Sequence, residues 1–406
     1  MNDRQICDLE MILNGGFAPL EGFLNKQDYE NVISDMRLNN GSLWPIPITL
    51  DVDKEFLNLV DVGDKVTLKD QEGFSLAVIE IEDVWEPDFI KESYFVYGTT
   101  DESHPGVEYL LNQSNPVYIG GAVKKIKLPH HYDYAEMRYD PDSLKEKFKD
   151  LGWTNIIAFQ TRNPLHKAHV EMTLSALDEI QANLLIHPVV GMTKPGDVDH
   201  YTRVRCYNHV LAEYPKNKAM LSLIPLAMRM AGPKEALWHA IIRKNYGCTH
   251  LIVGRDHAGP GQDKDGNPFY GPYDAQETLK EYEKEIGIKM VPFKFLVYLP
   301  EHDSYKPIDE ISKDTNYKTV SGTELRNYLD DGKDIPDWFT YKEVAKELQN
   351  SRPPISKRGF TVFFTGLSGS GKSTLANGLL IKLLEHGARP VTLLDGDIVR
   401  THLSSE

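Results

Sequence analysis

The sequence predicts an α/β protein with a β-rich N-terminal region, a parallel-sheet region and one further unit at its C-terminal end. Two observations indicate this class. Between about residues 150 and 300, apolar runs of strand length alternate with helical stretches, which is the pattern of a parallel sheet with crossover helices. Before residue 130, short extended segments follow a helical opening and are separated by Gly, Asp and Pro turns, which indicates a small β-rich domain.

The elements follow from these patterns in chain order. The N-terminal strands are expected at residues 42–52, 64–70, 75–85 and 116–128. The strands of the parallel sheet are expected at residues 155–160, 184–190, 220–226, 250–255 and 289–299, and the helices at residues 166–180, 199–214, 233–247 and 273–287. A later helix, residues 320–332, begins with Ser321 and Glu324 at capping-box spacing. We place domain boundaries at residues 1–133, 134–355 and 356–406.

Composition limits the classes of function. The 406 residues carry a formal charge of −15, which opposes broad attraction to nucleic acid or to an acidic membrane, so an anionic ligand must be bound by a local cluster of cations. Cys7, Cys206 and Cys248 are odd in number and form no CxxC pair, which fits a reducing compartment. No leader and no apolar run of about 20 residues is present, so we expect a cytoplasmic protein with no membrane partner.

The stretch "QTRNPLHKAH", residues 160–169, lies between an expected strand and an expected helix. Ligands of open parallel sheets bind at such strand ends, where a helix N-terminus offers free N–H groups to phosphate. His166 and His169 would share one helix face with Pro164 in the first turn, and Arg162 and Asn163 add a charged and a neutral donor. A zinc site is disfavoured, because zincin histidines are four residues apart with a Glu between them. Simple packing or capping of the histidines remains an alternative.

Two further strand ends carry cations. "HLIVGRDHAGPG" runs from a strand into a Gly-rich loop with Arg255, Asp256 and His257, where glycine permits close backbone approach to a ligand. An ordinary turn with solvated charges is the alternative. The other stretch, "GMTKPGDVDHYTRVR", contains Lys194, His200, Arg203 and Arg205, and we expect a mobile surface loop there. Together, cation-bearing strand ends in an acidic protein predict a polyphosphate substrate.

These stretches resemble the ATP sulfurylase (sulfate adenylyltransferase) family, whose catalytic domain is an HxxH nucleotidyltransferase. The similarity covers about residues 3–350 and includes "QTRNPLHKAH", "GRDHAGPG", "FYGPYDAQE" and "SGTELR". The resemblance implies a PUA-like N-terminal domain and a Rossmann-like catalytic domain. It also implies that ATP and sulfate are converted to adenylyl sulfate and pyrophosphate, with Mg²⁺ accompanying ATP, and that the protein is a homo-oligomer.

The resemblance also implies roles for individual residues. Gln160, Arg162 and the backbone of Ala258 would contact sulfate. Thr161, Arg162 and Asn163 match the active-site positions, and His166 and His169 match the pair that stabilises phosphates in the transition state. ATP would be held by Gln160, Thr161, Arg162, Asn163, Gly254, Arg255, Asp256, His257 and Leu296. No protein-held metal site is implied.

A second nucleotide motif, "GLSGSGKST", lies between the apolar run 360–365 and a helical stretch. It matches a P-loop, with Lys372 for phosphate and Ser373 for Mg²⁺. Its members are Gly366, Gly369, Gly371, Lys372, Ser373 and Thr374. The region resembles the start of adenylyl sulfate kinase, and the chain as a whole resembles bifunctional sulfurylase and kinase proteins shortened at both ends. We expect a strand–loop–helix–strand unit that is too short for assured kinase activity.

Three other functions stay open on sequence grounds. An HxxH nucleotidyltransferase with a phosphopantetheine or mononucleotide acceptor would use the same histidine pair, although Arg162 favours a small oxyanion. A non-catalytic PUA-like module could bind RNA, which the acidic composition disfavours. The P-loop unit could serve nucleotide sensing or assembly.

Overall fold

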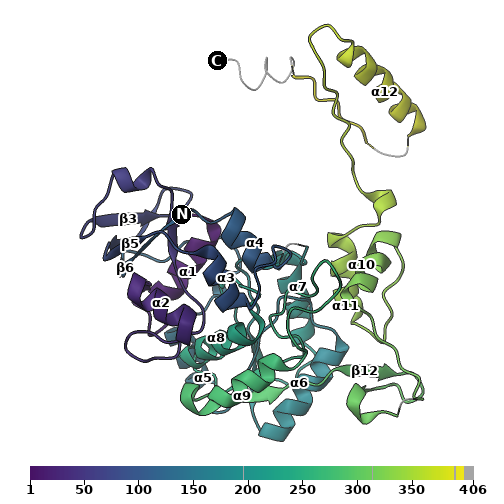
Figure 1. Ribbon diagram of the computed structural model, residues 1–406. Coiled ribbons are helices and arrows are strands. Elements are labelled where there is room, and N and C mark those ends of the chain that lie inside the picture. Colours follow the sequence, from purple (N-terminus) through teal and green to yellow (C-terminus); the bar gives the residue numbers. More distant parts are fainter. Residues whose placement is uncertain (195, 313, 388–389, 397–406) are drawn as a thin grey trace. The chain divides into compact units, whose positions relative to one another are not determined.

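The protein is described here by a computed structural model that covers residues 1–194, 196–312, 314–387 and 390–396 (Figure 1). It divides into two compact units, Met1–Arg352 and Pro353–Glu406. The predicted α/β class with a β-rich N-terminal region is confirmed.

The N-terminal region is built on a six-stranded sheet. Its strands are β1 (Gly22–Phe23), β2 (Leu50–Val52), β3 (Lys65–Lys69), β4 (Ser75–Glu80), β5 (Asp83–Trp85) and β6 (Val117–Lys125). The long strand β6 pairs antiparallel with β1, β2, β4 and β5, so it organises the whole sheet. The helices are α1 (Asp3–Leu13), α2 (Lys26–Asp35), α3 (Phe89–Tyr97) and α4 (Pro105–Asn112). The sequence predicted the helical opening but not the other three helices, which are only 8 to 10 residues long.

A five-stranded parallel sheet forms the second part of this unit. Its strands are β7 (Ile156–Phe159), β8 (Asn183–Ile186), β9 (Ala219–Leu221), β10 (His250–Val253) and β11 (Lys289–Pro292), in the order β11-β10-β7-β8-β9. The connecting helices are α6 (Lys167–Ile180), α7 (His200–Leu211), α8 (Gly232–Asn245) and α9 (Asp274–Ile286), and α5 (Pro141–Asp150) precedes the sheet. Successive strand residues alternate between two cores: Ala158 packs in one and Ile157 in the other, as expected of a sheet covered on both faces. The order of strands reverses between β7 and β10, which makes this the topological switch point.

The expected strand 289–299 is in fact two strands. Beyond β11, the chain turns at residues 293–295, and β12 (Leu296–Leu299) pairs antiparallel with β13 (Ser304–Pro307) in a separate sheet. Pro292 has no N–H for a longer ladder, which is consistent with the end of β11 there. Helices α10 (Gly322–Asp331) and α11 (Lys342–Ser351) complete the unit, and α10 has the expected Ser321–Glu324 capping box. Short 3-10 helices are found at Phe56–Asn58, Ala135–Met137, Ile308–Glu310 and Ile355–Lys357.

The second unit, Pro353–Glu406, contains helix α12 (Lys372–His386). The prediction of flanking strands at 360–365 and near 390 was wrong for the residues that are described, because neither segment is assigned as a strand. A strand exists only through pairing with a neighbour, and none of the described residues supplies such a ladder here.

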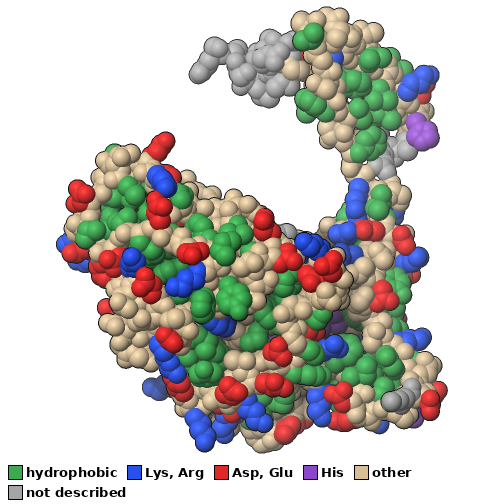
Figure 2. Space-filling model, in the orientation of Figure 1, with side chains coloured by type: hydrophobic (Ala, Val, Ile, Leu, Met, Phe, Trp, Pro, Cys, Tyr) green, Lys and Arg blue, Asp and Glu red, His purple; other side chains and the backbone are tan. Residues whose placement is uncertain are grey.

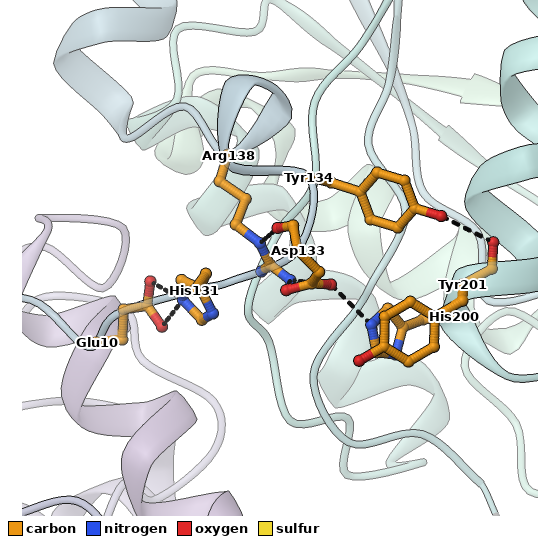
Figure 3. A network of polar contacts seen from close by, with 7 residues as sticks. All are labelled: Glu10, His131, Asp133, Tyr134, Arg138, His200 and Tyr201. Atoms are coloured by element: carbon orange, nitrogen blue, oxygen red, sulfur yellow. Dashed lines mark hydrogen bonds and ion pairs between the residues drawn. The ribbon is translucent and has the colours of Figure 1, made fainter.

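Polar contacts tie the N-terminal sheet region to the parallel-sheet region. Glu10 on α1 accepts from Nε2 of His131 at 2.8 Å (Figure 3). Asp133 holds both Arg138 and His200, at 2.8 and 2.9 Å. On the face shown in Figure 2, acidic and basic side chains of the first unit are interspersed. That distribution differs from the basic stripe of a nucleic-acid-binding surface.

Candidate active site

A cavity of about 350 Å³ lies outside the carboxyl ends of β7 and β10, at the switch point of the sheet. Almost all residues proposed from the sequence line it, from both strand-end loops and from the first turn of α6. They are Gln160, Thr161, Arg162, Asn163, His169, Gly254, Arg255, Asp256, His257, Ala258 and Leu296. His166 is not among the described lining residues and is only 7% exposed.

The loop after β7 presents an amide and shapes a tight turn. Oε1 of Gln160 is buried and has no hydrogen-bond partner among the described residues, while its Nε2 donates only to the thioether sulfur of Met228 at 3.8 Å, a weak acceptor that a ligand oxygen can replace. The hydroxyl of Thr161 donates to the carbonyl of Asn163 at 2.9 Å and accepts from its N–H at 3.0 Å. Thr161 therefore shapes the turn, while the side chain of Asn163 stays exposed.

Arg162 is held from one side by an acidic residue. Both carboxylate oxygens of Asp197 lie against Nη1 of Arg162, at 2.5 and 2.6 Å. Nη2 and Nε make no hydrogen bond to any described residue. This edge of the guanidinium can therefore donate two parallel hydrogen bonds to an oxyanion.

The two histidines of the HxxH stretch have different surroundings. His166 packs on Phe339, with ring centroids 4.1 Å apart, and its Nδ1 lies 3.1 Å from Oγ1 of Thr340. Nδ1 of His169 accepts the backbone N–H of His166 at 3.1 Å and so caps α6, which begins at Lys167. Pro164 consequently precedes the helix and does not lie in its first turn as predicted.

The cap determines the protonation pattern of His169. An Nδ1 that accepts a hydrogen bond carries no proton, so the neutral ring has its proton on Nε2. Burial lowers the pKa of His169 to about 4, and burial together with the nearby His169 lowers the pKa of His166 well below its ordinary value. The pair is therefore neutral at pH 7, so His169 can offer a phosphate an N–H donor but not a positive charge.

The loop after β10 has an unusual backbone. Asp256 and Ala258 have positive φ angles of 54° and 52°, a conformation that residues other than glycine adopt at some cost and that clusters at ligand sites. The N–H of Ala258 makes no hydrogen bond to a described residue, while its carbonyl accepts from Gly232 at 3.2 Å. The free N–H of Ala258 is therefore available as a hydrogen-bond donor, as the expected contact between sulfate and the Ala258 backbone requires.

His257 extends from this loop toward the helix α8. Its Nε2 lies 3.0 Å from Nδ1 of His239. Burial lowers the pKa of His257 to about 3, with a smaller effect from His239, so this ring is also neutral. Arg255, in contrast, is half exposed and lies 3.3 Å from Asp256.

The sequence reasoning missed an aromatic wall. Phe293 stacks on His169 at 6.2 Å with an interplanar angle of 14°, and Trp338 stacks on Tyr298 at 5.0 Å. Both pairs line the cavity. Such flat apolar surfaces suit a purine base. The stretches "VPFKF" and "DWFTY" were the available signals, but only Leu296, which directly follows the first of them, was proposed from the sequence.

The cluster expected to be a mobile surface loop is in part a structural element. Arg203 is only 2% exposed and donates to the carbonyls of Val189 and Val198 at 2.8 and 2.9 Å. Arg205 pairs with Glu347 at 2.6 Å. Lys194 donates to the carbonyl of Pro260 at 2.6 Å. These residues hold the fold around the cavity and are not part of its described lining.

The chain offers no cage for a resident metal within the residues described, since no group of three or more His, Cys, Asp or Glu side chains is suitably placed. Of the described lining residues, Asp256 is the one carboxylate. This donor set fits a Mg²⁺ ion that keeps water and phosphate oxygens as its main ligands. Within the same described residues, no helix is long and apolar enough to cross a membrane. All three cysteines are free thiols.

The P-loop of the second unit begins its helix as the motif predicts. α12 starts at Lys372, directly after Gly371, which has a positive φ of 84°. Nζ of Lys372 folds back onto the carbonyl of Leu367 at 2.7 Å, and Oγ of Ser373 lies 3.5 Å from Asp395. Gly366 and Gly369 also have positive φ angles, which glycine adopts readily.

Comparison with known proteins identifies three family profiles along the chain. The family profile ATP-sulfurylase matches residues 135–351, the PUA-like domain profile matches 1–128, and the adenylylsulphate kinase profile matches 358–406. Proteins named sulfate adenylyltransferase from Phaeosphaeria nodorum and Mycosarcoma maydis are 53% and 51% identical over 409 residues, covering 100% of this chain and 71% of each relative.

A solved structure gives the same result at the level of the fold. The structure titled hexameric APS kinase from Thiobacillus denitrificans matches with a TM-score of 0.80 and 34% identity, covering 100% of this chain and 73% of that one. Together with the strand-end cavity and its HxxH stretch, these matches show that the chain belongs to the ATP-sulfurylase family.

Proposed function

We propose that this protein is a sulfate adenylyltransferase, which converts ATP and sulfate into adenylyl sulfate and pyrophosphate. The observation that supports this most directly is the convergence of two strand-end loops on one cavity. Gln160 and Arg162 follow β7, and the free N–H of Ala258 follows β10. This set of one guanidinium edge, one amide and one backbone donor suits a small tetrahedral oxyanion.

The reaction requires positioning more than acid–base chemistry. A sulfate oxygen attacks the α-phosphorus of ATP, a new P–O bond forms, and the bond to the pyrophosphate oxygen breaks. Sulfate is fully ionised at neutral pH, so no residue has to remove a proton from it. The site has to bring two anions together and stabilise the charge that grows on the leaving group.

We assign the residues in this scheme as follows. Arg162, Gln160 and the backbone of Ala258 hold sulfate. Nε2–H of His169 donates to a phosphate oxygen as pyrophosphate leaves, while His166 supports it from behind. The nucleotide lies along Gln160, Thr161, Arg162, Asn163, Gly254, Arg255, Asp256, His257 and Leu296. Mg²⁺ would accompany ATP through its phosphate oxygens and supply further charge neutralisation there.

A direct assay tests this function against the other nucleotidyltransferase activities. Pyrophosphate release from ATP is measured with sulfate, with phosphopantetheine, with a mononucleotide or with RNA as the added compound. We expect stimulation by sulfate alone. Release that depends on phosphopantetheine or a mononucleotide would instead select the alternative acceptor.

The P-loop unit supports a second proposal. The loop glycines, Lys372 and Ser373 have the arrangement of a phosphate-binding loop, so we propose that residues 356–406 bind a nucleotide. We keep the division into residues 1–133, 134–355 and 356–406 as a proposal. Limited proteolysis followed by mass spectrometry tests it, with cleavage expected near residues 133 and 355.

Assembly and location are two further proposals, each with its own observation. The solved relative is titled as a hexamer, so we propose a homo-oligomer for this chain and expect light scattering to give a mass of several subunits. Three free thiols fit a reducing compartment, so we propose a cytoplasmic location, which fractionation of cells tests.

A further inference from the structure

Glu235, His239 and His257 form a chain of polar side chains from the first turn of α8 to the wall of the cavity. Glu235 and His239 are fully buried. Nδ1 of His239 lies 3.0 Å from Nε2 of His257. On the other side of the ring, Nε2 of His239 lies 3.3 Å from Oε1 of Glu235, close enough for electrostatic attraction although the two atoms are not aligned as a hydrogen bond. His257 is one of the residues that line the cavity, and its Nδ1 makes no hydrogen bond to a described residue.

The protonation state of Glu235 determines which atoms donate and which accept along these three side chains. Its two oxygens accept the backbone N–H groups of Arg229 and Ala231, at 3.1 and 2.8 Å. It also lies in the first turn of α8, where the helix dipole favours negative charge. Burial raises the pKa of Glu235 above its ordinary value, and the two N–H donors and the guanidinium of Arg229 only reduce that rise. Geometry nevertheless favours the carboxylate form, because both oxygens are occupied as acceptors of backbone N–H groups and a carboxylate can only accept hydrogen bonds.

The protonation of both histidines follows from that carboxylate. At 3.3 Å from a carboxylate oxygen, an Nε2 lone pair of His239 would be repelled and an Nε2 proton attracted, so His239 carries its proton on Nε2 and leaves Nδ1 as an acceptor. Nε2 of His257 must then be the donor across the 3.0 Å contact. Burial lowers the pKa of both rings far enough to keep them neutral, so His257 has no second proton.

We infer that Glu235 and His239 are positioning residues that hold His257 in its Nε2-protonated form, so that Nδ1 of His257 accepts a hydrogen bond from a donor group of the nucleotide. Phosphate and sulfate oxygens only accept, so they do not suit this nitrogen. The groups of ATP that can donate are the ribose hydroxyls and the adenine amino group. His257 therefore selects the nucleoside part, in contrast to His169, whose Nε2–H serves an anion. The inference rests on the proposed function.

Nucleotide analogues test this assignment in the full-length protein. Pyrophosphate release with sulfate is measured for ATP, 2′-deoxy-ATP, 3′-deoxy-ATP and purine riboside triphosphate, in the unaltered protein and in His257→Ala. We expect one analogue to lose about tenfold in kcat/KM in the unaltered protein, as for one hydrogen bond of about 1.4 kcal/mol, and to lose less than about twofold in the variant. The affected analogue identifies the donor group. Equal penalties in both proteins for every analogue would overturn the inference.

A pair of substitutions at His239 separates positioning from packing. His239→Asn keeps a carbonyl acceptor near the Nδ1 position, whereas His239→Ala removes it. We expect His239→Asn to keep the analogue penalty and His239→Ala to lose it as His257→Ala does. Ile242→Ala, at another fully buried site on α8, is the control for simple destabilisation, since it should lower Tm and leave the analogue penalty unchanged. If both His239 variants keep the full penalty, His239 only packs.

The two proposals fail in distinguishable ways. If the unaltered protein releases no pyrophosphate with ATP and sulfate, the proposed function is wrong. If it does so and the penalties do not depend on His257, only the inference about the Glu235 chain is wrong.

Discussion

Asp197 contacts Arg162 through Nη1 alone and leaves the opposite edge of the guanidinium open toward the cavity. The pair is mostly buried, with side chains 20% and 12% exposed, so it is shielded from solvent more than a surface ion pair. Asp197 thereby fixes the orientation of Arg162. In the proposed scheme, where Arg162 holds sulfate, Asp197 contributes to the sulfate site without contacting sulfate itself.

Replacing Asp197 should weaken sulfate binding rather than strengthen it. In Asp197→Asn the guanidinium loses its charged orienting partner, and we expect the KM for sulfate to rise about tenfold, in line with a charge-assisted hydrogen bond of about 1.5 kcal/mol or more. The KM for ATP and kcat should change less than threefold. A fall in the KM for sulfate would show instead that Asp197 competes with the substrate.

Arg162→Lys is expected to fail as a conservative exchange. A lysine ammonium is a point charge that cannot span two oxygens of sulfate with a planar fork while also holding Asp197. We expect kcat/KM for sulfate to fall at least 100-fold, measured as sulfate-dependent pyrophosphate release. Near-normal use of sulfate by this variant would refute the assignment of Arg162.

His169→Asn separates the two roles of this histidine. The carbonyl of Asn can still accept the N–H of His166 and cap α6, but no donor remains at the position of Nε2. We expect kcat to fall about 100-fold, the size reported for losing one donor to a developing charge, with the KM for ATP within threefold. His169→Ala should lower Tm in addition. The companion variant His166→Ala should also reduce turnover more than ATP binding, and unchanged turnover would assign His166 to packing alone.

The neutral histidines give stability a definite dependence on pH. The pKa of His169 is lowered to about 4 in the folded protein, against an ordinary value near 6.5, so the unfolded chain binds more protons between these values. The stability contributed by neutral His169 is fully present above pH 6.5 and is lost as the pH falls toward 4. We expect Tm to fall between pH 7 and pH 5, and to fall less in His169→Asn, as measured by differential scanning fluorimetry. An identical fall in both proteins would contradict the role of His169.

Lys372→Ala should remove a second nucleotide site without affecting the first. Nζ of Lys372 is the one P-loop side chain suited to phosphate charge, and the cavity at β7 and β10 belongs to the other compact unit. We expect isothermal titration with a non-hydrolysable ATP analogue to show two sites per chain in the unaltered protein and one in the variant. Sulfate-dependent pyrophosphate release should be equal in the two proteins.

Much of the site could be predicted because its residues lie next to strand ends in the sequence. The loops at Gln160–Asn163 and Gly254–Ala258 follow short apolar runs, and parallel strands bring their carboxyl ends to one edge of a sheet. The residue types then indicated an anion. The same local reasoning correctly located the capping box at Ser321.

Contacts between distant parts of the chain could not be predicted in this way. Phe339 and Thr340 meet His166 across more than 170 residues, and no local pattern indicates that pairing. Burial of Arg203 was missed because a cation near a Gly turn resembles a solvated one, although here two backbone carbonyls satisfy it. The buried protonation pattern of Glu235 and His239 likewise depends on tertiary contacts alone.

The segment around Phe339 has one more consequence. The carbonyl of Phe339 accepts the N–H of Lys167 at 3.2 Å, and the ring of Phe339 packs against His166. Phe339, which lies outside the parallel sheet, therefore contacts the start of α6, where both histidines lie. In the proposed scheme, a substitution that changes this packing would shift His166 and His169 relative to the leaving pyrophosphate. Turnover could therefore be changed by a substitution at Phe339, a residue that bears no charge.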